Sequence, residues 1–381
     1  MKNKTLVMIP GPTPLVEVVK DEMARDIQAF GDPRFVKDYK SLIDGMHDLY
    51  QCDGKTFVLA GTGTLGMEFA IANATKKDDN ILVISHGFFG DRFVEIGERK
   101  GLKVDLIQSQ WGKTVSLDEV KEKLQSKDYA LVTLTHVDTS TGVASDVEGI
   151  SNLLKDYPNT IFVVDGICSV GAYNYNLQDL GIDYLLTGSQ KAFGVSPGLF
   201  MIWASQKALD RRASLGMIPE YYVDLEKWVP IMDDPSKYFA TPAVNLIWSM
   251  KAALNLIQEE GAQAREDRHR KHAQACAKAY QALGFELLAD EECRAITLSN
   301  LIYPEGLDDV TFRNTILEEG GVIAGGLGAY AGKMCRIGHM GNIDESDLIA
   351  GIGIVERALS ACGFKDKVGL GVSTFLQELS K

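Results

Sequence analysis

Short apolar runs alternate with amphipathic stretches along the first half of the chain. The apolar runs predict buried strands at 56–59, 81–84, 104–107, 130–135, 161–164, 184–187 and 199–203. The stretches between them predict helices at 65–74, 91–100, 117–125 and 150–156. Buried strands that alternate with helices are typical of a mostly parallel sheet covered by helices on both faces. We therefore expect an α/β fold with right-handed crossover connections.

The pattern changes after Thr241. Residues 244–260 predict one long helix that ends at a glycine, and residues 262–283 predict a second helix rich in Ala, Arg and Lys. Two further strands, at 297–303 and 334–337, are each followed by a helical pattern, which indicates a smaller α+β domain. We expect three parts: an N-terminal extended arm over 1–20, a large domain over 21–260, and a small C-terminal domain over 261–381.

Composition narrows the choice of partners. Of the 381 residues, 45% are apolar and 24% are charged, as in ordinary globular proteins. The chain carries 39 basic and 52 acidic residues, so its formal net charge is −13. Nucleic acids and anionic membranes attract positively charged proteins, so neither is an expected partner. An anionic small ligand would need donors placed locally around it.

Signals for location and for metal binding are sparse. The apolar run at 5–9 is too short for a secretory signal, and no stretch approaches the ~20 apolar residues of a membrane-spanning helix. The six cysteines contain no C-x-x-C pair, which is typical of reduced thiols in a cytoplasmic protein. His269 and His272 share a predicted helix face with no Cys or Glu, so we predict a cytoplasmic protein without a metal site.

A glycine-rich turn, Gly61-Thr62-Gly63-Thr64-Leu65-Gly66, follows the first predicted strand and opens a helix. A tight turn alone would need these glycines, but the pattern also fits a dinucleotide site or a cradle for one phosphate. A dinucleotide site requires an acidic residue at the end of the next strand, where this chain has Ser85-His86-Gly87. The two threonine hydroxyls suit a single phosphate, so the phosphate cradle is the preferred interpretation.

Two charged residues follow later strands at the same edge of the predicted sheet. Asp165 ends the strand at 161–164, where parallel sheets bind ligands, although a helix N-cap would favour the same residue. Lys191 follows the strand at 184–187 and lies among glycines and apolar residues. A solvated lysine is the ordinary case, but partial desolvation lowers the pKa of a lysine and makes its neutral amine a nucleophile.

A phosphate cradle, a strand-end carboxylate and a sheltered lysine are together the three anchors of pyridoxal 5′-phosphate. The lysine forms a Schiff base with the cofactor aldehyde, and the carboxylate keeps the pyridine nitrogen protonated. A helix N-terminus holds the phosphate. The combination predicts pyridoxal 5′-phosphate as the cofactor, with Lys191 and Asp165 as the catalytic residues.

Further motifs occur in an order and spacing that carry a family resemblance. They are Pro10-Gly11-Pro12, His86 to Arg92, His136 to Gly142, Val164 to Ser169, Gly188 to Lys191, Tyr238 to Pro242, and Arg336 to Gly338. With these motifs the chain resembles the class V aminotransferases of fold type I, most of all the alanine–glyoxylate and serine–pyruvate aminotransferases. The resemblance covers nearly the whole chain and implies a homodimer with a mostly parallel sheet between helices in its large domain.

The resemblance implies contacts with the cofactor. Phosphate-binding positions of the family match Thr62, Gly63, Thr64 and Gln190. Phe89 matches an aromatic residue, often Trp, that stacks on the pyridine ring, and Ile167 matches the aliphatic residue on the other ring face. Thr139 matches a hydroxyl residue near the polar edge of the cofactor. Judged by side-chain type alone, Phe89 and Ile167 would be core residues and Thr139 a turn residue.

The resemblance also implies contacts with the substrate and with a second subunit. Arg336 matches the arginine that clamps the substrate carboxylate, and Gly11 is placed with it in the substrate site. Tyr238 and Thr241 match residues that reach the phosphate of the neighbouring subunit's cofactor, so the active sites would be shared across the dimer. The chain departs from the family at 31–35, where a His-Arg-Ser or His-Arg-Thr segment is common.

The implied activity is transamination between a small amino acid, alanine or serine, and a 2-oxo acid, glyoxylate or pyruvate. An aminotransferase for another donor such as aspartate and a cysteine desulfurase-like lyase are the enzymatic alternatives. A desulfurase would need a histidine in place of Phe89 and a cysteine on a mobile loop, whereas Cys335 lies in a predicted strand. A regulatory protein that binds a dinucleotide at Gly61–Gly66 is the non-enzymatic alternative.

Overall fold

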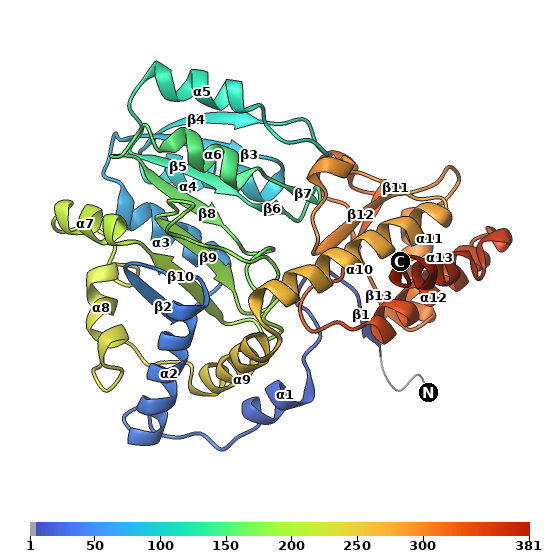
Figure 1. Ribbon diagram of the computed structural model, residues 1–381, viewed down its shortest axis with the longest axis horizontal. Coiled ribbons are helices and arrows are strands. Elements are labelled where there is room, and N and C mark those ends of the chain that lie inside the picture. Colours follow the sequence, from blue (N-terminus) through green and yellow to red (C-terminus); the bar gives the residue numbers. More distant parts are fainter. Residues whose placement is uncertain (1–4) are drawn as a thin grey trace.

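The computed structural model describes residues 5–381, which form two main sheets, each with its own helices, and two short two-stranded pairs (Figure 1). The larger sheet has seven strands in the order β2-β10-β9-β8-β5-β3-β4. Its strands are β2 (Lys55–Ala60), β3 (Asn80–Ser85), β4 (Lys103–Gln108), β5 (Leu131–Thr135), β8 (Ile161–Asp165), β9 (Tyr184–Gly188) and β10 (Leu199–Ala204). Every residue of β5, β8, β9 and β10 is buried, as the apolar runs predict for central strands.

One strand of this sheet departs from the parallel arrangement. β10 runs antiparallel to both of its neighbours, β2 and β9, whereas the pairs β3–β4, β3–β5, β5–β8 and β8–β9 are parallel. The connection at 189–198 contains no helix, and a parallel crossover usually requires a dozen or more residues. The chain therefore reverses direction here. β2 remains parallel to the other strands, so its carboxyl end lies at the same edge as those of β8 and β9.

Helices cover both faces of the large sheet (Figure 1). They are α2 (Pro33–Leu49), α3 (Gly63–Ala74), α4 (Phe88–Arg99), α5 (Leu117–Ser126), α6 (Val147–Leu154), α7 (Gln206–Ser214), α8 (Leu225–Asp233) and α9 (Val244–Glu260). α9 has the predicted bounds, but α4 begins three residues before the predicted start at 91. Asp138 accepts hydrogen bonds from the N–H groups of Phe89 and Gly90 and so caps α4 from a distant segment.

The second sheet is antiparallel, with strand order β11-β12-β15-β14, and has a separate hydrophobic cluster. Its strands are β11 (Glu286–Leu287), β12 (Leu298–Ile302), β14 (Ala324–Gly325) and β15 (Met334–Gly338). Its helices are α10 (Ala262–Ala282), α11 (Asp309–Glu318), α12 (Glu345–Ala361) and α13 (Leu370–Leu379). α10 runs from the large sheet toward the small one (Figure 1). This body contains the strand that carries Arg336.

The N-terminal segment lies between the two sheets. β1 (Leu6–Val7) pairs in parallel with β13 (Gly321–Val322), so the first described residues belong to the C-terminal body. The first four residues of the predicted arm over 1–20 lie outside the described residues. The arm is not extended throughout, because α1 (Glu17–Met23) forms within it and packs on α9. A short hairpin of β6 (Val137–Asp138) and β7 (Val143–Ala144) completes the strands near the site.

A further property of the helices is how their length and hydrophobicity compare with those of membrane-spanning helices. Among residues 5–381, no helix is both long and apolar enough to cross a membrane.

Candidate active site

A cavity of about 150 Å³ opens at the carboxyl ends of β2, β8 and β9. It brings together many of the residues predicted to contact a cofactor: Thr62, Gly63, Thr64, Phe89, Thr139, Asp165, Ile167, Gln190 and Lys191. Arg92, Val137 and Cys168 also line it. The cavity lies at the edge where open α/β sheets bind ligands. The sequence prediction that these residues share one site therefore agrees with where the structure places them.

Lys191 is held by the N-terminal segment. Its Nζ donates a hydrogen bond to the carbonyl oxygen of Pro10 at 2.5 Å, and Thr13 Oγ1 donates to the carbonyl oxygen of Lys191 at 2.7 Å. Gly11 has φ +105°, and a Cβ atom there would lie 2.5 Å from Lys191 Cδ. Gly11 thus leaves room for the lysine side chain. The structure places this residue, predicted in the substrate site, directly against the lysine.

Asp165 is a buried carboxyl group with few partners. It is 2% exposed, and its Oδ1 accepts from the N–H of Ile167 at 2.9 Å. Burial raises the pKa of Asp165 to about 7, and the Ile167 N–H group opposes that shift. The nearby Asp138 raises the pKa further, whereas Arg92 and Lys191 lower it. A cationic N–H donor placed in the cavity would hold this carboxyl group in its ionised form.

The N-terminus of α3 forms the phosphate cradle that the sequence predicts. Thr62 is the N-cap residue, and its side chain makes no capping hydrogen bond to the helix. The first N–H groups of a helix have no partner within the helix, so they are available to an anion. A Cβ at Gly63 would lie 2.3 Å from Ile167 Cδ1, so only glycine fits between the cradle and Ile167.

A buried acceptor beside the lysine also lacks a partner. Gln190 Oε1 makes no hydrogen bond to any residue of 5–381, although it is buried. A buried amide group without partners is unfavourable unless a ligand completes it. The free helix N-terminus, the unpaired Gln190 Oε1 and the buried carboxyl of Asp165 together fit a phosphorylated pyridine ring carrying a protonated nitrogen.

Arg92 and Asp138 are site residues that the sequence analysis did not single out. Arg92 Nη1 donates to Thr64 Oγ1 at 2.8 Å, and its guanidinium lies 5.1 Å from the centre of the Phe89 ring. Arg92 follows Phe89 by three positions on α4, and this i, i+3 spacing was the available signal. Asp138 is fully buried and accepts a hydrogen bond from the N–H group of Phe89, the residue predicted to stack on the cofactor ring.

Thr139 and Arg336 lie on the side of the cavity that faces the small sheet. Thr139 Oγ1 is 2.6 Å from Cys168 Sγ, which makes it a partner of that thiol. Arg336 is half-buried on β15 opposite Asn300 of β12, and its Nε donates to the carbonyl oxygen of Gly325 at 2.8 Å. Burial lowers the pKa of Arg336, while Cys168 and Asp138 act in the opposite direction. This arginine does not line the cavity itself but stands next to it.

Tyr238 and Thr241 are not brought to this cavity. Tyr238 is 61% exposed, and its hydroxyl lies 3.2 Å from Thr241 Oγ1. Its ring packs on Phe30 with centres 5.1 Å apart. Their predicted contact with a neighbouring subunit's cofactor remains a prediction. In the segment that departs from the family, Arg34 is exposed and paired with Asp32 at 2.8 Å, which leaves it as a surface charge.

The seven-stranded, mostly parallel sheet and the cavity at its carboxyl edge define an aminotransferase of fold type I. The alanine–glyoxylate aminotransferase of Nostoc sp. superposes on this chain with a TM-score of 0.88 at 29% identity, covering 93% of this chain and 95% of that one. The family model Aminotransferase class-V matches residues 37–326. The chain belongs to this family.

Relatives of known sequence agree with this membership. The chain is 35% identical over 370 residues to an uncharacterised aminotransferase of Methanocaldococcus jannaschii, covering 96% of this chain and 95% of the relative. It is also 35% identical over 363 residues to alanine–glyoxylate aminotransferase 1 of Saccharomyces cerevisiae, covering 89% and 93%. The predicted fold class and the predicted aminotransferase activity are confirmed. The family and its fold imply pyridoxal 5′-phosphate as the cofactor.

Proposed function

We propose that this aminotransferase uses pyridoxal 5′-phosphate to move the amino group of alanine or serine to glyoxylate or pyruvate. The observation that carries the cofactor assignment is that Lys191, Asp165 and the N-terminus of α3 line one cavity. Support for the substrates comes from relatives named alanine–glyoxylate and serine–glyoxylate aminotransferase. When bound, the cofactor supplies an electron-accepting ring that makes the substrate Cα–H bond acidic.

The residues of this chain have separate tasks in the proposal. Lys191 Nζ would hold the cofactor covalently and, once freed by the substrate amine, would act as the base for the Cα proton and then as the acid that delivers it. Asp165 holds the proton on the ring nitrogen, which requires its carboxyl to be ionised in the loaded enzyme. Gln190, Thr62, Gly63 and Thr64 bind the phosphate, and Phe89 and Ile167 hold the ring between them.

Arg336 orients the substrate in this proposal. Its Nε is engaged by Gly325, which leaves the outer guanidinium nitrogens to bind the α-carboxylate of an amino acid. The arginine therefore fixes the Cα at a constant distance from Lys191. Arg336 forms no ion pair within residues 5–381. A bound substrate carboxylate would therefore supply the negative charge that this half-buried guanidinium lacks.

We further propose a homodimer with shared active sites. Tyr238 and Thr241 would supply phosphate ligands to the partner subunit's cofactor. Two large aromatic side chains of this region are exposed, Tyr221 (70%) and Tyr238 itself (61%). Tyr221 packs on Phe239, the residue after Tyr238, at 5.3 Å between ring centres, so exposed aromatic surface gathers around the segment 238–239. Such a surface is typical of a protein–protein interface.

The two enzymatic alternatives, an aspartate aminotransferase and a cysteine desulfurase-like lyase, receive different support. An aspartate donor is favoured by a relative named L-aspartate–glyoxylate aminotransferase in Paracoccus denitrificans, which is 29% identical over 381 residues. A desulfurase would need a reactive thiol beside the substrate. Cys335 is fully buried in β15, and burial raises its pKa to about 12, so it is not a nucleophile on a mobile loop. Membership of the aminotransferase family contradicts the dinucleotide-binding regulatory alternative.

A half-reaction screen tests this function. The purified protein, loaded with pyridoxal 5′-phosphate, is mixed with each amino acid, and conversion of the cofactor to its amine form is followed by visible absorption. We expect conversion with alanine or serine and none with Lys191→Ala, which should still bind cofactor through the phosphate and ring contacts. Fast conversion by aspartate alone would replace the donor, and full turnover by Lys191→Ala would overturn the mechanism.

A further inference from the structure

A buried arginine lies at the junction between the two sheets. Gly261, with φ +83°, separates α9 from α10, and Arg265 stands in the first turn of α10 with only 2% of its surface exposed. Both features are unfavourable in themselves, since a helix N-terminus repels cations and burial desolvates the charge. Burial indeed lowers the pKa of Arg265, and Glu260 offsets that effect. Because both the helix N-terminus and burial disfavour a cation here, the arginine suggests a role that requires its hydrogen-bond donors and that an apolar residue could not fill.

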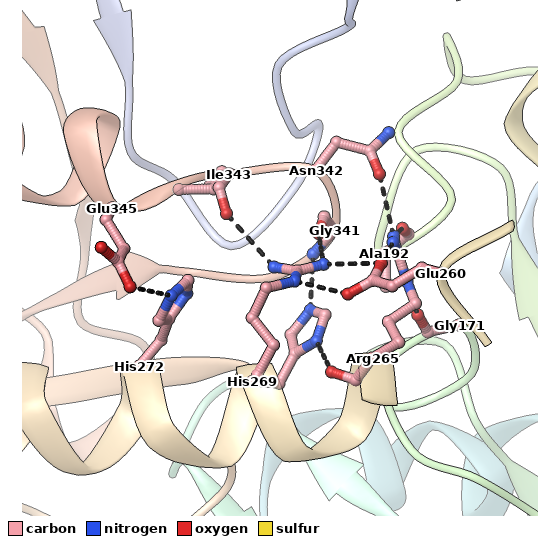
Figure 2. A network of polar contacts seen from close by, with 11 residues as sticks. Gly171, Ala192, Glu260, Arg265, His269, His272, Gly341, Asn342, Ile343 and Glu345 are labelled. Carbon is pink, nitrogen blue, oxygen red and sulfur yellow. Dashed lines mark hydrogen bonds and ion pairs between the residues drawn. The ribbon is translucent and has the colours of Figure 1, made fainter. Parts of the chain in front are cut away.

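The guanidinium of Arg265 joins four segments of the chain (Figure 2). Nε donates to the carbonyl oxygen of Gly171 at 2.6 Å, and Nη1 donates to Glu260 at 2.5 Å. Nη2 donates both to the carbonyl oxygen of Ala192, at 2.9 Å, and to Asn342 Oδ1, at 3.0 Å. All of these acceptors lie in different elements or loops. A planar group with five donors is suited to such a junction, whereas a lysine has one nitrogen.

The positions of two of these acceptors connect Arg265 to the active site. Ala192 is the residue after Lys191, so its carbonyl belongs to the loop that carries the lysine. Asn342 follows Arg336 by six positions, in the segment that leaves β15. A single nitrogen, Nη2, therefore bridges the lysine loop and the segment after the arginine strand.

Neighbouring residues of α10 hold the same segment in place. Arg268 donates to the carbonyl oxygens of Gly341 at 3.0 Å and Ile343 at 3.3 Å. His269 Nε2 accepts from the N–H of Gly341 at 2.9 Å, which leaves Nδ1 as the donor to the carbonyl oxygen of Arg265. Burial lowers the pKa of His269 well below its usual range, so the neutral ring that accepts this bond is the stable form. The segment at 341–343 is thus tied to α10 at three successive residues.

We propose that Arg265 is a positioning residue that sets the distance and angle between Lys191 and Arg336. The inference rests on the proposed function, in which Lys191 takes a proton from the Cα of a substrate held by Arg336. Proton transfer requires the amine to stay within hydrogen-bonding reach of that carbon, and small misplacements reduce rates strongly. Arg265 supports this geometry from outside the cavity, because it donates hydrogen bonds to the lysine loop and to the segment after β15 without lining the cavity.

The test compares Arg265→Gln with Arg212→Gln in the loaded enzyme. Arg212 is also buried, at 1% exposure, but its hydrogen bonds and ion pairs within residues 5–381 go to Asp224, Gly216 and Glu226, away from the lysine loop and the segment after β15. Both variants should lose thermal stability. Arg265→Gln alone should slow the alanine half-reaction roughly tenfold to a hundredfold. It should also move the pH midpoint of the cofactor's visible absorption by about half a unit or more.

A second pair of variants keeps the proposal testable if Arg265→Gln does not fold. Arg265→Lys keeps the charge but loses the bridge, so it should show the same shift of the midpoint in smaller degree. Asn342→Ala removes only the hydrogen bond between Arg265 and the segment after β15, and it should raise the amino-acid concentration needed for half-maximal conversion. Absorption and half-reaction rates of Arg265→Gln or Arg265→Lys equal to those of Arg212→Gln would overturn the proposal. Loaded wild-type protein that converts its cofactor with none of the amino acids would instead refute the function itself.

Discussion

Lys191 Nζ donates its hydrogen bond to the carbonyl oxygen of Pro10, a residue 181 positions earlier in the chain. The N-terminal segment therefore forms one wall of the lysine's surroundings. Gly11 lies in the same wall, and Thr13 Oγ1 binds the carbonyl oxygen of Lys191. The contact links the reactive amine to a segment that pairs with the small sheet through β1. The position of the amine thus depends on both bodies of the protein.

Gly11→Ala should disturb the lysine directly. The new methyl group would lie 2.5 Å from Lys191 Cδ, and φ of +105° is strained for alanine. We expect a loss of about 1–3 kcal/mol in the free energy of unfolding and weaker cofactor retention. Thermal melting and the cofactor-to-protein absorbance ratio after dialysis measure the two effects. Gly31→Ala is the matched control, because nothing lies within 4 Å of a Cβ at that position; equal behaviour of the two variants would contradict the contact.

Asp165 predicts a pH dependence for the cofactor-free protein. Burial raises its pKa from 3.8 to about 7, so the folded state binds a proton more tightly than the unfolded state. The free energy of unfolding should therefore fall as pH rises from about 4 to about 7, by an amount on the order of a few kcal/mol. Urea unfolding at a series of pH values measures this. Asp165→Asn should flatten that part of the curve, and an unchanged slope in the variant would assign the dependence to another group.

Cofactor binding should weaken this pH dependence of the free energy of unfolding. A protonated ring nitrogen beside Asp165 stabilises its ionised form, so the loaded enzyme should keep its stability to higher pH than the cofactor-free protein. Asp165→Asn should retain cofactor yet lose transamination by roughly 100-fold or more, since the ring would lose its proton. Single-turnover kinetics with alanine measures the loss. Turnover within a few-fold of wild type would show that the carboxylate does not act on the ring.

Arg336→Lys should weaken substrates while leaving the cofactor bound. A lysine cannot donate to Gly325 and to a carboxylate in the same planar geometry, and a charge-assisted hydrogen bond is worth about 1.5–3 kcal/mol. The concentration of alanine for half-maximal conversion should rise by roughly tenfold to a hundredfold. Arg99→Lys, at an exposed pair with Glu95 on α4, is the control. A parallel loss of cofactor and substrate would count against a carboxylate clamp.

Tyr238→Phe tests the shared active site. Among residues 5–381 the hydroxyl has one hydrogen-bonding partner, Thr241, on an exposed surface, so removing it should change the unfolding free energy by less than about 0.5 kcal/mol. The affinity for pyridoxal 5′-phosphate should nevertheless fall by about fivefold, as expected for one lost hydrogen bond. Equilibrium dialysis and sedimentation measure affinity and assembly, with Tyr157→Phe, in the loop between α6 and β8, as the control. A monomer that retains cofactor fully would refute the cross-subunit contact.

Local pattern was sufficient for the elements and for much of the cavity. α9 has the predicted bounds, and Thr62, Asp165 and Lys191 meet because each lies at the carboxyl end of a strand of one sheet. Parallel strands bring their carboxyl ends to a common edge, so order along the chain already implies proximity there. The reversal at β10 was not predicted, because an apolar run has no direction and only the short helix-free connection reveals it.

The sequence by itself determined the fold class, the family and the residues at the strand ends, because these depend on periodicity and on motifs a few residues long. Tertiary structure alone decided which side chains hold those residues in place. Pro10 meets Lys191, Asp138 caps the helix of Phe89, and Arg265 reaches Ala192 and Asn342 across 73 and 77 positions. Hydrogen bonds between such distant segments leave no periodic trace in a sequence, since they depend on the distance between atoms after the two bodies have packed.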